Sequence, residues 1–337
     1  MSVANFFRLT EGDFDAELLE QVAADVQDVE EELHLQTASR VELVEQVSRH
    51  TLEAGGKRLR PAFVSLSAKA IGLDYDRKRT TKLGACMEMI HMATLIHDDV
   101  IDNADTRRGI ETAGARYGNT SSILSGDALL AKAMVILALD GDLEIIRNVS
   151  QSVVEMAEGE VRELATRYDF DLAEDEHLEV LRMKTAAFIQ SCCEVGAIVA
   201  GASAEQRDAL KTYGYHIGMA FQIIDDLLDY RGDQEQTGKP QATDFREGCA
   251  TLPLIYLRPL LSDNEREVAR RKFGNGVTDD ELLMISEWMK VRGAYAKAQE
   301  TAADHVAKAI AELEKLPETS ARHMLRAAAE FVAARDA

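Results

Sequence analysis

The chain has 337 residues, with 59 acidic and 38 basic side chains and a formal net charge of −21. This charge argues against a nucleic-acid partner, because such binding needs Lys and Arg to neutralise phosphates. Only 5 prolines occur and aromatic residues make up 6%, which favours an all-α protein. The sequence shows no linker and no change in composition. We therefore predict a single all-α domain over residues 41–337, with residues 1–40 as an N-terminal helical arm of that domain.

The cysteines and the N-terminus bear on where the protein works. Cys86, Cys192, Cys193 and Cys249 form neither a secreted disulfide framework nor a zinc-ligand spacing, so we expect reduced thiols and a cytoplasmic location. The first residues lack the pattern of a signal peptide. No apolar run approaches 18 residues, so we expect no transmembrane segment.

Apolar periodicity predicts helices along most of the chain. In chain order the expected ranges are 13–37, 41–54, 61–71, 80–102, 121–139, 143–167, 176–201, 205–230, 250–260, 263–272, 278–290, 292–315 and 319–334. The polar segment 231–249 contains Gly232, Gly238 and Pro240 and is predicted to be a loop. Because it directly follows Asp225, Asp226 and Asp229, this segment is a candidate lid.

Two aspartate clusters share the pattern D-D-x-x-D and close apolar helices. They are Asp98, Asp99 and Asp102, and Asp225, Asp226 and Asp229. Residues four apart share one helix face, so the outer carboxylates of each cluster repel one another unless a cation lies between them. Such hard oxygen ligands suit Mg²⁺, which takes one or two carboxylates and substrate phosphate oxygens. We predict that both clusters line one cavity and hold a single metal–phosphate group.

The ends of the two helices support a cation. Gly109 and Gly232 follow the clusters and are the expected helix terminators. The aspartates then lie near helix C-termini, where the macrodipole disfavours carboxylates. A bound cation would remove that conflict.

The cationic counterparts of these clusters are few. Gly55-Gly56 lets the backbone approach a ligand closely, and Lys57 and Arg60, which flank the turn that follows, are phosphate-binding candidates. Arg107 and Arg108 follow the first aspartate cluster, and their adjacent side chains should point in different directions.

Two histidines, His91 and His97, lie on the helix of the first cluster and could equally be buried and structural. Glu88-x-x-His91 and Glu174-x-x-His177 also fit a di-iron carboxylate bundle. The second copy lies in an acidic stretch that we expect to be solvated.

Seven motifs together resemble the trans-isoprenyl diphosphate synthase (polyprenyl synthetase) family, and they occur in the family's order. They are GGKRLRP at 55–61, EMIHMATLIHDDVID at 88–102, TRRG at 106–109, KT at 184–185, FQIIDDLLD at 221–229, TGKPQATD at 237–244 and FVAAR at 331–335. The resemblance covers the chain from about residue 45 to its end. It implies an isoprenoid-synthase-type helical bundle around a deep central cavity, a homodimer, and condensation of an allylic diphosphate with isopentenyl diphosphate.

The resemblance also implies roles for individual residues. The Mg²⁺ ligands would be Asp98, Asp102, Asp225 and Asp229, with Asp99 and Asp226 supporting them. The allylic diphosphate would be held by Arg107, Lys184 and Lys239, and isopentenyl diphosphate by Lys57, Arg60, His91 and Arg108. Thr185 and Gln222 would line the reacting centre. Small residues at Ala93 and Thr94, with Met134 as a deeper floor, imply a product longer than C15.

Two positions depart from the family pattern. Ala242 stands where the family has glycine, and Cys249 stands where it has a second lysine, so one cationic contact is missing. A weakly active or non-catalytic subunit of a two-component synthase is therefore an alternative. A class I terpene cyclase is a further one, although it has no use for GGKRLRP.

Overall fold

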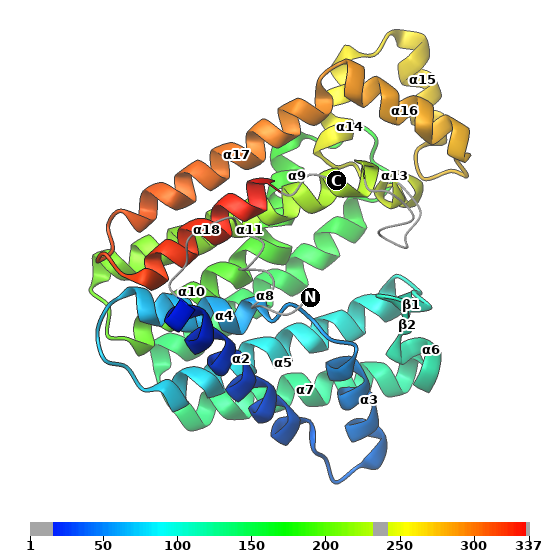
Figure 1. The fold of residues 1–337 in the computed structure, drawn as a ribbon. Coiled ribbons are helices and arrows are strands. Elements are labelled where there is room, and N and C mark those ends of the chain that lie inside the picture. The colour runs from blue at the N-terminus through cyan, green and yellow to red at the C-terminus, as the bar shows by residue number, and fades with distance from the viewer. Residues whose placement is uncertain (1–15, 232–241, 335–337) are drawn as a thin grey trace. The chain divides into compact units, whose positions relative to one another are not determined.

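The structure is a computed structural model that describes residues 16–231 and 242–334. Its contacts divide the chain into two compact units, each built from segments far apart in the sequence. The first unit comprises residues 1–150, 191–211 and 313–328, and the second comprises 151–190, 212–312 and 329–337. The predicted all-α class is confirmed (Figure 1). The prediction of one domain with an N-terminal arm stays a prediction.

The first unit contains the N-terminal helices and a short hairpin (Figure 1). Its elements are α2 (Ala16–Thr37), α3 (Glu42–Glu53), α4 (Leu59–Ala70), α5 (Arg77–Ile101), β1 (Thr106–Arg107), β2 (Ile110–Glu111), α6 (Ala113–Tyr117) and α7 (Asn119–Asp140). Helix α5 packs against α7, α4 and α2. Leu83, Met87 and Ile90, spaced three to four apart on α5, are at most 1% exposed and form the centre of this core.

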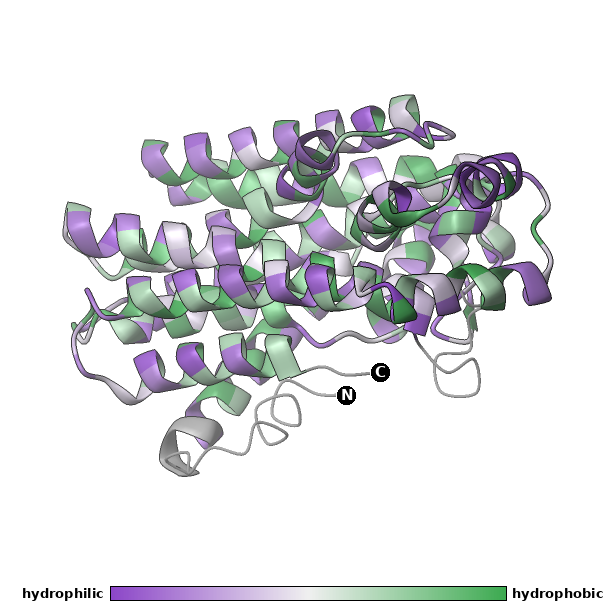
Figure 2. Cartoon of the chain, turned by 90° about the horizontal axis from the view of Figure 1, so that it is seen from above, coloured by the Kyte–Doolittle hydropathy of each residue, from purple (hydrophilic) through white to green (hydrophobic). Residues whose placement is uncertain are grey.

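The second unit contains most of the C-terminal half. Its elements are the later part of α8 (Leu143–Thr166), α9 (Glu174–Leu181), the π-helix η1 (Arg182–Ala186), α10 (Ala187–Val199), α11 (Ala204–Arg231), α13 (Thr243–Glu247), α14 (Leu252–Leu257), the 3₁₀-helix η2 (Arg258–Leu260), α15 (Asp263–Lys272), α16 (Asp279–Val291), α17 (Ala294–Leu313) and α18 (Ser320–Ala334). The division between the units also falls within α10, α11, α17 and α18, so that most of α10 and of α18 belongs to the first unit. The helices carry hydrophobic and hydrophilic residues on different faces (Figure 2), as the periodicity predicts.

Two local predictions differ from the structure. Gly109 does not end α5: Asn103, with φ of 51°, follows that helix, while Arg108 (φ 55°) and Gly109 (φ 77°) form the two-residue turn between β1 and β2. Gly232 lies outside the described residues. Part of the predicted loop 231–249 is helical, since α13 occupies Thr243–Glu247.

The sequence led us to expect no segment long and apolar enough to span a membrane, and helix α7 does not meet that expectation. Judged by length and composition alone it could cross one, with a mean hydropathy of 1.8 over its most apolar window, of which 39% is buried. One such helix is weak evidence, because core helices of soluble proteins pass the same test. Its exposed apolar face nevertheless requires an explanation.

Candidate active site

The first aspartate cluster lies at the C-terminal end of α5, as predicted. Asp98 is half-buried and Asp102, the residue that caps the helix, is exposed. Asp99 is turned about 100° away from Asp98 on the helix and is only 7% exposed. Its Oδ1 accepts a hydrogen bond of 2.7 Å from Nε of Arg107 in the hairpin. The predicted Arg107 is therefore bound to the cluster itself in this structure.

Four arginines surround His91, which lies two turns before Asp98 on the same helix. Burial lowers the pKa of His91 well below its usual value, and the charges of Arg60, Arg108, Arg107 and Arg58 lower it further. The imidazole is therefore neutral at physiological pH. Burial and neighbouring cations also lower the pKa of Arg60 and of Arg108. The sequence predicted three of these arginines as anion ligands, and the structure brings all of them together.

Arg58 holds this cationic group in place, a role that the sequence did not reveal. Its backbone is left-handed, with φ of 47°, at the start of α4. Its guanidinium donates to Glu30 (2.6 Å), to Glu88 (3.0 Å) and to the carbonyl of Leu52 (3.0 Å). A Cβ at Gly56 would lie 3.0 Å from Arg58 Nη1, so a larger residue there would displace the end of the Arg58 side chain.

The second aspartate cluster lies near the C-terminal end of α11, in the other unit. Asp225 and Asp229 are half-buried, whereas Asp226 is 6% exposed. Asp226 Oδ2 lies 3.1 Å from Nε2 of His177, and its Oδ1 accepts a 3.1 Å hydrogen bond from Gln222. His177 is 5% exposed, so the expectation that it is solvated was wrong. Its apolar neighbours at one-turn spacing, not its acidic ones, determine its burial.

Thr185 and Gln222, predicted to line the reacting centre, are in contact. The Thr185 hydroxyl donates to Gln222 Oε1 at 3.0 Å. Thr185 lies in the π-helix η1, and π-helical turns are rare and frequent at functional sites. The sequence predicted one unbroken helix here, because a single extra residue in a turn leaves no clear trace in hydrophobic periodicity.

Lys184, also in η1, is held by two carboxylates of α8. Its Nζ lies 2.9 Å from Glu160 and contacts Glu163 as well. Burial alone would lower the pKa of Lys184, but the two carboxylates outweigh that effect and raise it. A Cβ at Gly159 would lie 2.7 Å from Met183 Cβ, so this glycine allows α8 and η1 to pack closely. The lysine is therefore charged and oriented in the absence of any ligand.

The segment after α11 returns to Asp229. The Asp244 amide donates to Asp229 Oδ2 at 3.0 Å, and the Ala242 amide donates to the Asp229 carbonyl at 2.8 Å. Burial, followed by the charge of Asp229, raises the pKa of Asp244 well above its usual value. Ala242 has φ of 52°, a left-handed conformation in which glycine is unstrained. Ala242 therefore adopts, at a cost in strain, a backbone conformation that a glycine at this position would adopt freely.

Cys249 is a neutral group. Burial raises the pKa of its thiol to about 12, and the carboxylates of Glu163 and Asp244 add to the shift. It therefore supplies no positive charge where the family has lysine. Lys239 lies outside the described residues.

The remaining predicted residues belong to the first unit. Lys57 and Met134 are half-buried, Ala93 is 1% exposed, and the Thr94 hydroxyl donates to the His91 carbonyl at 2.8 Å. Their proposed roles in binding and in chain length stay predictions.

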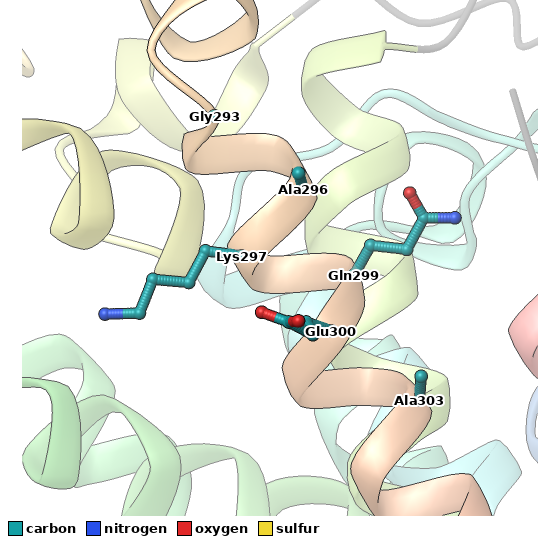
Figure 3. A pocket seen from close by; sticks show the side chains of 6 residues that line it. All are labelled: Gly293, Ala296, Lys297, Gln299, Glu300 and Ala303. Atoms are coloured by element: carbon teal, nitrogen blue, oxygen red, sulfur yellow. The ribbon is translucent and has the colours of Figure 1, made fainter.

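Two features of the second unit lie outside the predicted site. A hollow of about 490 Å³ on α17 is lined by Gly293, Ala296, Lys297, Gln299, Glu300 and Ala303 (Figure 3). Five of the six come from α17 and Gly293 directly precedes that helix, so the hollow lacks the converging walls of a substrate site. His216 of α11 and His305 of α17 place their Nδ1 atoms 3.0 Å apart. Burial, His216 and Lys308 lower the pKa of His305 to about 4.

Comparisons with known proteins agree with this geometry. The polyprenyl synthetase family model matches residues 41–286. Octaprenyl diphosphate synthase of Escherichia coli (strain K12) is 36% identical over 317 residues, which cover 94% of this chain and 98% of that protein. Heptaprenyl diphosphate synthase component 2 of Geobacillus stearothermophilus is 36% identical over 312 residues, which cover 93% and 96%. A polyprenyl synthase of Caulobacter crescentus CB15, solved with calcium and isoprenyl diphosphate, is 35% identical with a TM-score of 0.87, covering 95% of this chain and 97% of that one.

Helices that end in paired aspartate clusters, together with the arginine group around His91, are typical of a prenyltransferase of the all-α isoprenoid-synthase fold. The chain belongs to the polyprenyl synthetase family and is a polyprenyl diphosphate synthase. The family resemblance predicted from the motifs is thereby confirmed, and the di-iron bundle and the terpene cyclase are excluded.

Proposed function

We propose that the protein condenses an allylic diphosphate with isopentenyl diphosphate in a Mg²⁺-dependent reaction and releases a product longer than C15. The named relatives make octaprenyl and heptaprenyl products, which supports a long chain. The observation that carries the proposal is the arginine group around the neutral His91, on the same helix as Asp98. Seven residues separate them, which is roughly 10 Å of helix. One helix would thus carry a residue of the anion site and a residue of the cation site, two turns apart.

The residues fit the implied metal. Carboxylate oxygens are the ligands that Mg²⁺ prefers, and it needs only one or two of them because substrate phosphate oxygens complete its shell. Among the residues that the structure describes, no three His, Cys, Asp or Glu side chains form a ready cage. Asp98 and Asp102 of the first cluster, and Asp225 and Asp229 of the second, would supply ligands to such an ion. The ion would stabilise negative charge on the departing diphosphate.

The protein side chains then have distinct tasks in the reaction. Lys184 and Arg107 would take up the allylic diphosphate and stabilise its charge as the carbon–oxygen bond breaks. Lys57, Arg60 and Arg108 would hold isopentenyl diphosphate by charge-assisted hydrogen bonds. The alkene would attack the allylic carbocation, and the departing diphosphate would take up the proton that is then lost, so no protein nucleophile is required. The neutral imidazole of His91 would accept or donate a hydrogen bond without adding charge to the site.

The test is a Mg²⁺-dependent assay with labelled isopentenyl diphosphate and primers of several lengths, resolving product length. Asp98→Ala and Asp225→Ala should each lower kcat by about 10²–10³ or more. Their circular dichroism and melting temperature should match the parent, because removing one of several clustered charges relieves repulsion. Parent-like turnover in both variants would refute the roles of the two clusters.

We also propose that a second copy of the chain covers α7. Leu124, Val135 and Leu139 are 59%, 56% and 82% exposed, and they lie on one helix face with the exposed Ala131. Apolar patches of this kind mark protein interfaces. The location would be cytoplasmic, with α7 in a dimer and not in a bilayer. Val135→Arg should convert a detergent-free dimer to monomer by light scattering, and a monomeric parent would refute the proposal.

A two-component synthase is the second candidate, and Cys249 favours it. A neutral thiol replaces a lysine, and one relative is named component 2 of a heptaprenyl synthase. The purified chain alone decides between them: activity comparable with a single-chain synthase favours the homodimer. Activity that appears only on adding a second polypeptide favours the two-component enzyme.

A further inference from the structure

His177 is a buried histidine for which the proposed reaction gives no role. It lies on α9, within the sequence EDEHLEVL, and is 5% exposed. Its Nε2 lies 3.1 Å from Asp226 Oδ2 in the second aspartate cluster. An ionised carboxylate only accepts hydrogen bonds, so Nε2 carries the proton and donates.

Asp226 is bound on both sides within the same unit. His177 donates to Oδ2, and Gln222, one helical turn earlier on α11, donates to Oδ1 at 3.1 Å. Gln222 in turn accepts from Thr185 of η1 at 3.0 Å. These hydrogen bonds form one continuous network that connects α9, η1 and α11. Both oxygens of Asp226 therefore have partners in the protein.

Helix geometry separates Asp226 from its neighbours in the cluster. Successive residues are rotated by about 100°, so Asp225 and Asp229, four apart, lie within about 40° of each other. Asp226 is turned about 100° from Asp225, toward α9. The hydrogen bond between His177 and Asp226 therefore restrains the rotation of α11 about its axis. It thereby restrains the direction in which Asp225 and Asp229 point.

We propose that His177 is a positioning residue of the second aspartate cluster. Its hydrogen bond to Asp226 orients Asp225 and Asp229, and so sets their affinity for a divalent cation bound with diphosphate. Such outer partners of metal ligands typically change metal affinity or activity 10–100-fold. The inference rests on the proposed function, because that function assigns the cation to Asp225 and Asp229.

The test compares variants of His177 that differ in their ability to donate. His177→Phe keeps a ring of similar size and removes the donor, whereas His177→Gln keeps an amide donor. Calorimetry with Mn²⁺ in the presence of inorganic diphosphate measures the cation affinity of the full-length enzyme. His177→Phe should raise the Mn²⁺ Kd about 10–100-fold. His177→Gln should stay within about threefold of the parent, by the same reasoning.

Tyr256 of α14 provides a matched control, because it makes a hydrogen bond to the same helix α9. Its hydroxyl donates to Glu174 of α9 at 2.7 Å and has no bond to Asp226. Tyr256→Phe should lower the melting temperature and leave the Mn²⁺ Kd unchanged. Equal Kd values for His177→Phe and His177→Gln would overturn the proposal. So would a Kd for Tyr256→Phe raised as far as that of His177→Phe, since packing alone would then explain the effect.

The design separates this inference from the proposed function. A parent that binds Mn²⁺ with diphosphate but performs no condensation would refute the function and leave the positioning role testable by Kd. A parent that condenses, with parent-like Kd in His177→Phe, would refute only the inference. Should the Phe variant fail to fold, His177→Met removes the donor with a flexible side chain and gives the same comparison with His177→Gln.

Discussion

Replacement of Arg58 by methionine tests whether the buried ion cluster supports the anion site. Arg58 is 5% exposed and donates at 3.0 Å to Glu88, which is itself 3% exposed. Methionine fills much of the same space, so the change removes charge and hydrogen bonds more than volume. The principal consequence is that Glu88 loses its close counter-charge inside the protein.

The cost follows from that burial. Removing one partner of a buried ion pair typically destabilises a protein by about 3–5 kcal/mol, because the other charge is left uncompensated. Glu30 adds little, since its side chain is 29% exposed and water can replace the lost contact. Against a total stability of about 5–15 kcal/mol, Arg58→Met should leave a marginally stable enzyme.

Urea unfolding of single and double variants measures the effect. Arg58→Met/Glu88→Met removes both buried charges and should be more stable than Arg58→Met by at least about 1 kcal/mol. Recovery should be incomplete, because Glu88 also offsets the charges of Arg60 and Arg108. The KM for isopentenyl diphosphate should rise in both variants. A cost below about 1 kcal/mol for Arg58→Met, or a double variant less stable than the single, would refute this reasoning.

Three further predictions concern other residues. Cys249→Lys should lower the KM for the allylic primer by about 10- to 100-fold at most and leave that for isopentenyl diphosphate unchanged, because one charge-assisted contact is worth about 1.5–3 kcal/mol; steady-state kinetics measures it. Thr94→Phe and Ala93→Tyr should shorten the product to C15 or C20 by mass spectrometry, with Ala93→Tyr also destabilised by about 1–3 kcal/mol because its site is closely packed. His305→Phe should flatten the loss of unfolding free energy between pH 6.5 and about 4, measured by urea unfolding at several pH values.

The sign of the His305 effect follows from its environment. Burial comes first, and His216 and Lys308 add repulsion, whereas Asp304 attracts the proton. The folded state thus binds this proton less readily than the unfolded chain. The associated stability is complete above pH 6.5 and is lost as the pH falls toward 4. An unchanged pH dependence in His305→Phe would contradict this assignment.

Element positions were largely predictable because the helices are amphipathic and strongly periodic. The ranges expected for α3, α7, α8 and α11 agree with the structure within about two residues. Short elements were missed, since the five residues of α6 or α13 are too few to show a period. The turn at Arg108 was missed because a non-glycine residue there has positive φ, which its sequence neighbours do not require.

The candidate site was predictable where residue type alone restricts the chemistry. Clustered carboxylates imply a cation, and clustered arginines imply an anion. Arg58 and His177 escaped prediction because their roles depend on partners distant in sequence, Glu88 and Asp226. A buried charge and a solvated one have the same letter code, and only the fold distinguishes them.

The two D-D-x-x-D clusters show why the motif has its particular spacing. In each, the first and last aspartates lie four apart and share a face, while the second is turned about 100° aside. Asp99 and Asp226 occupy that second position, and both are buried, at 7% and 6% exposure. Arg107 binds one and His177 binds the other. A single outer pair would suffice to hold a cation, so the second aspartate is best explained as the anchor that orients the pair. Asp99→Asn and Asp226→Asn should therefore weaken Mn²⁺ binding while leaving both carboxylates of each outer pair in place.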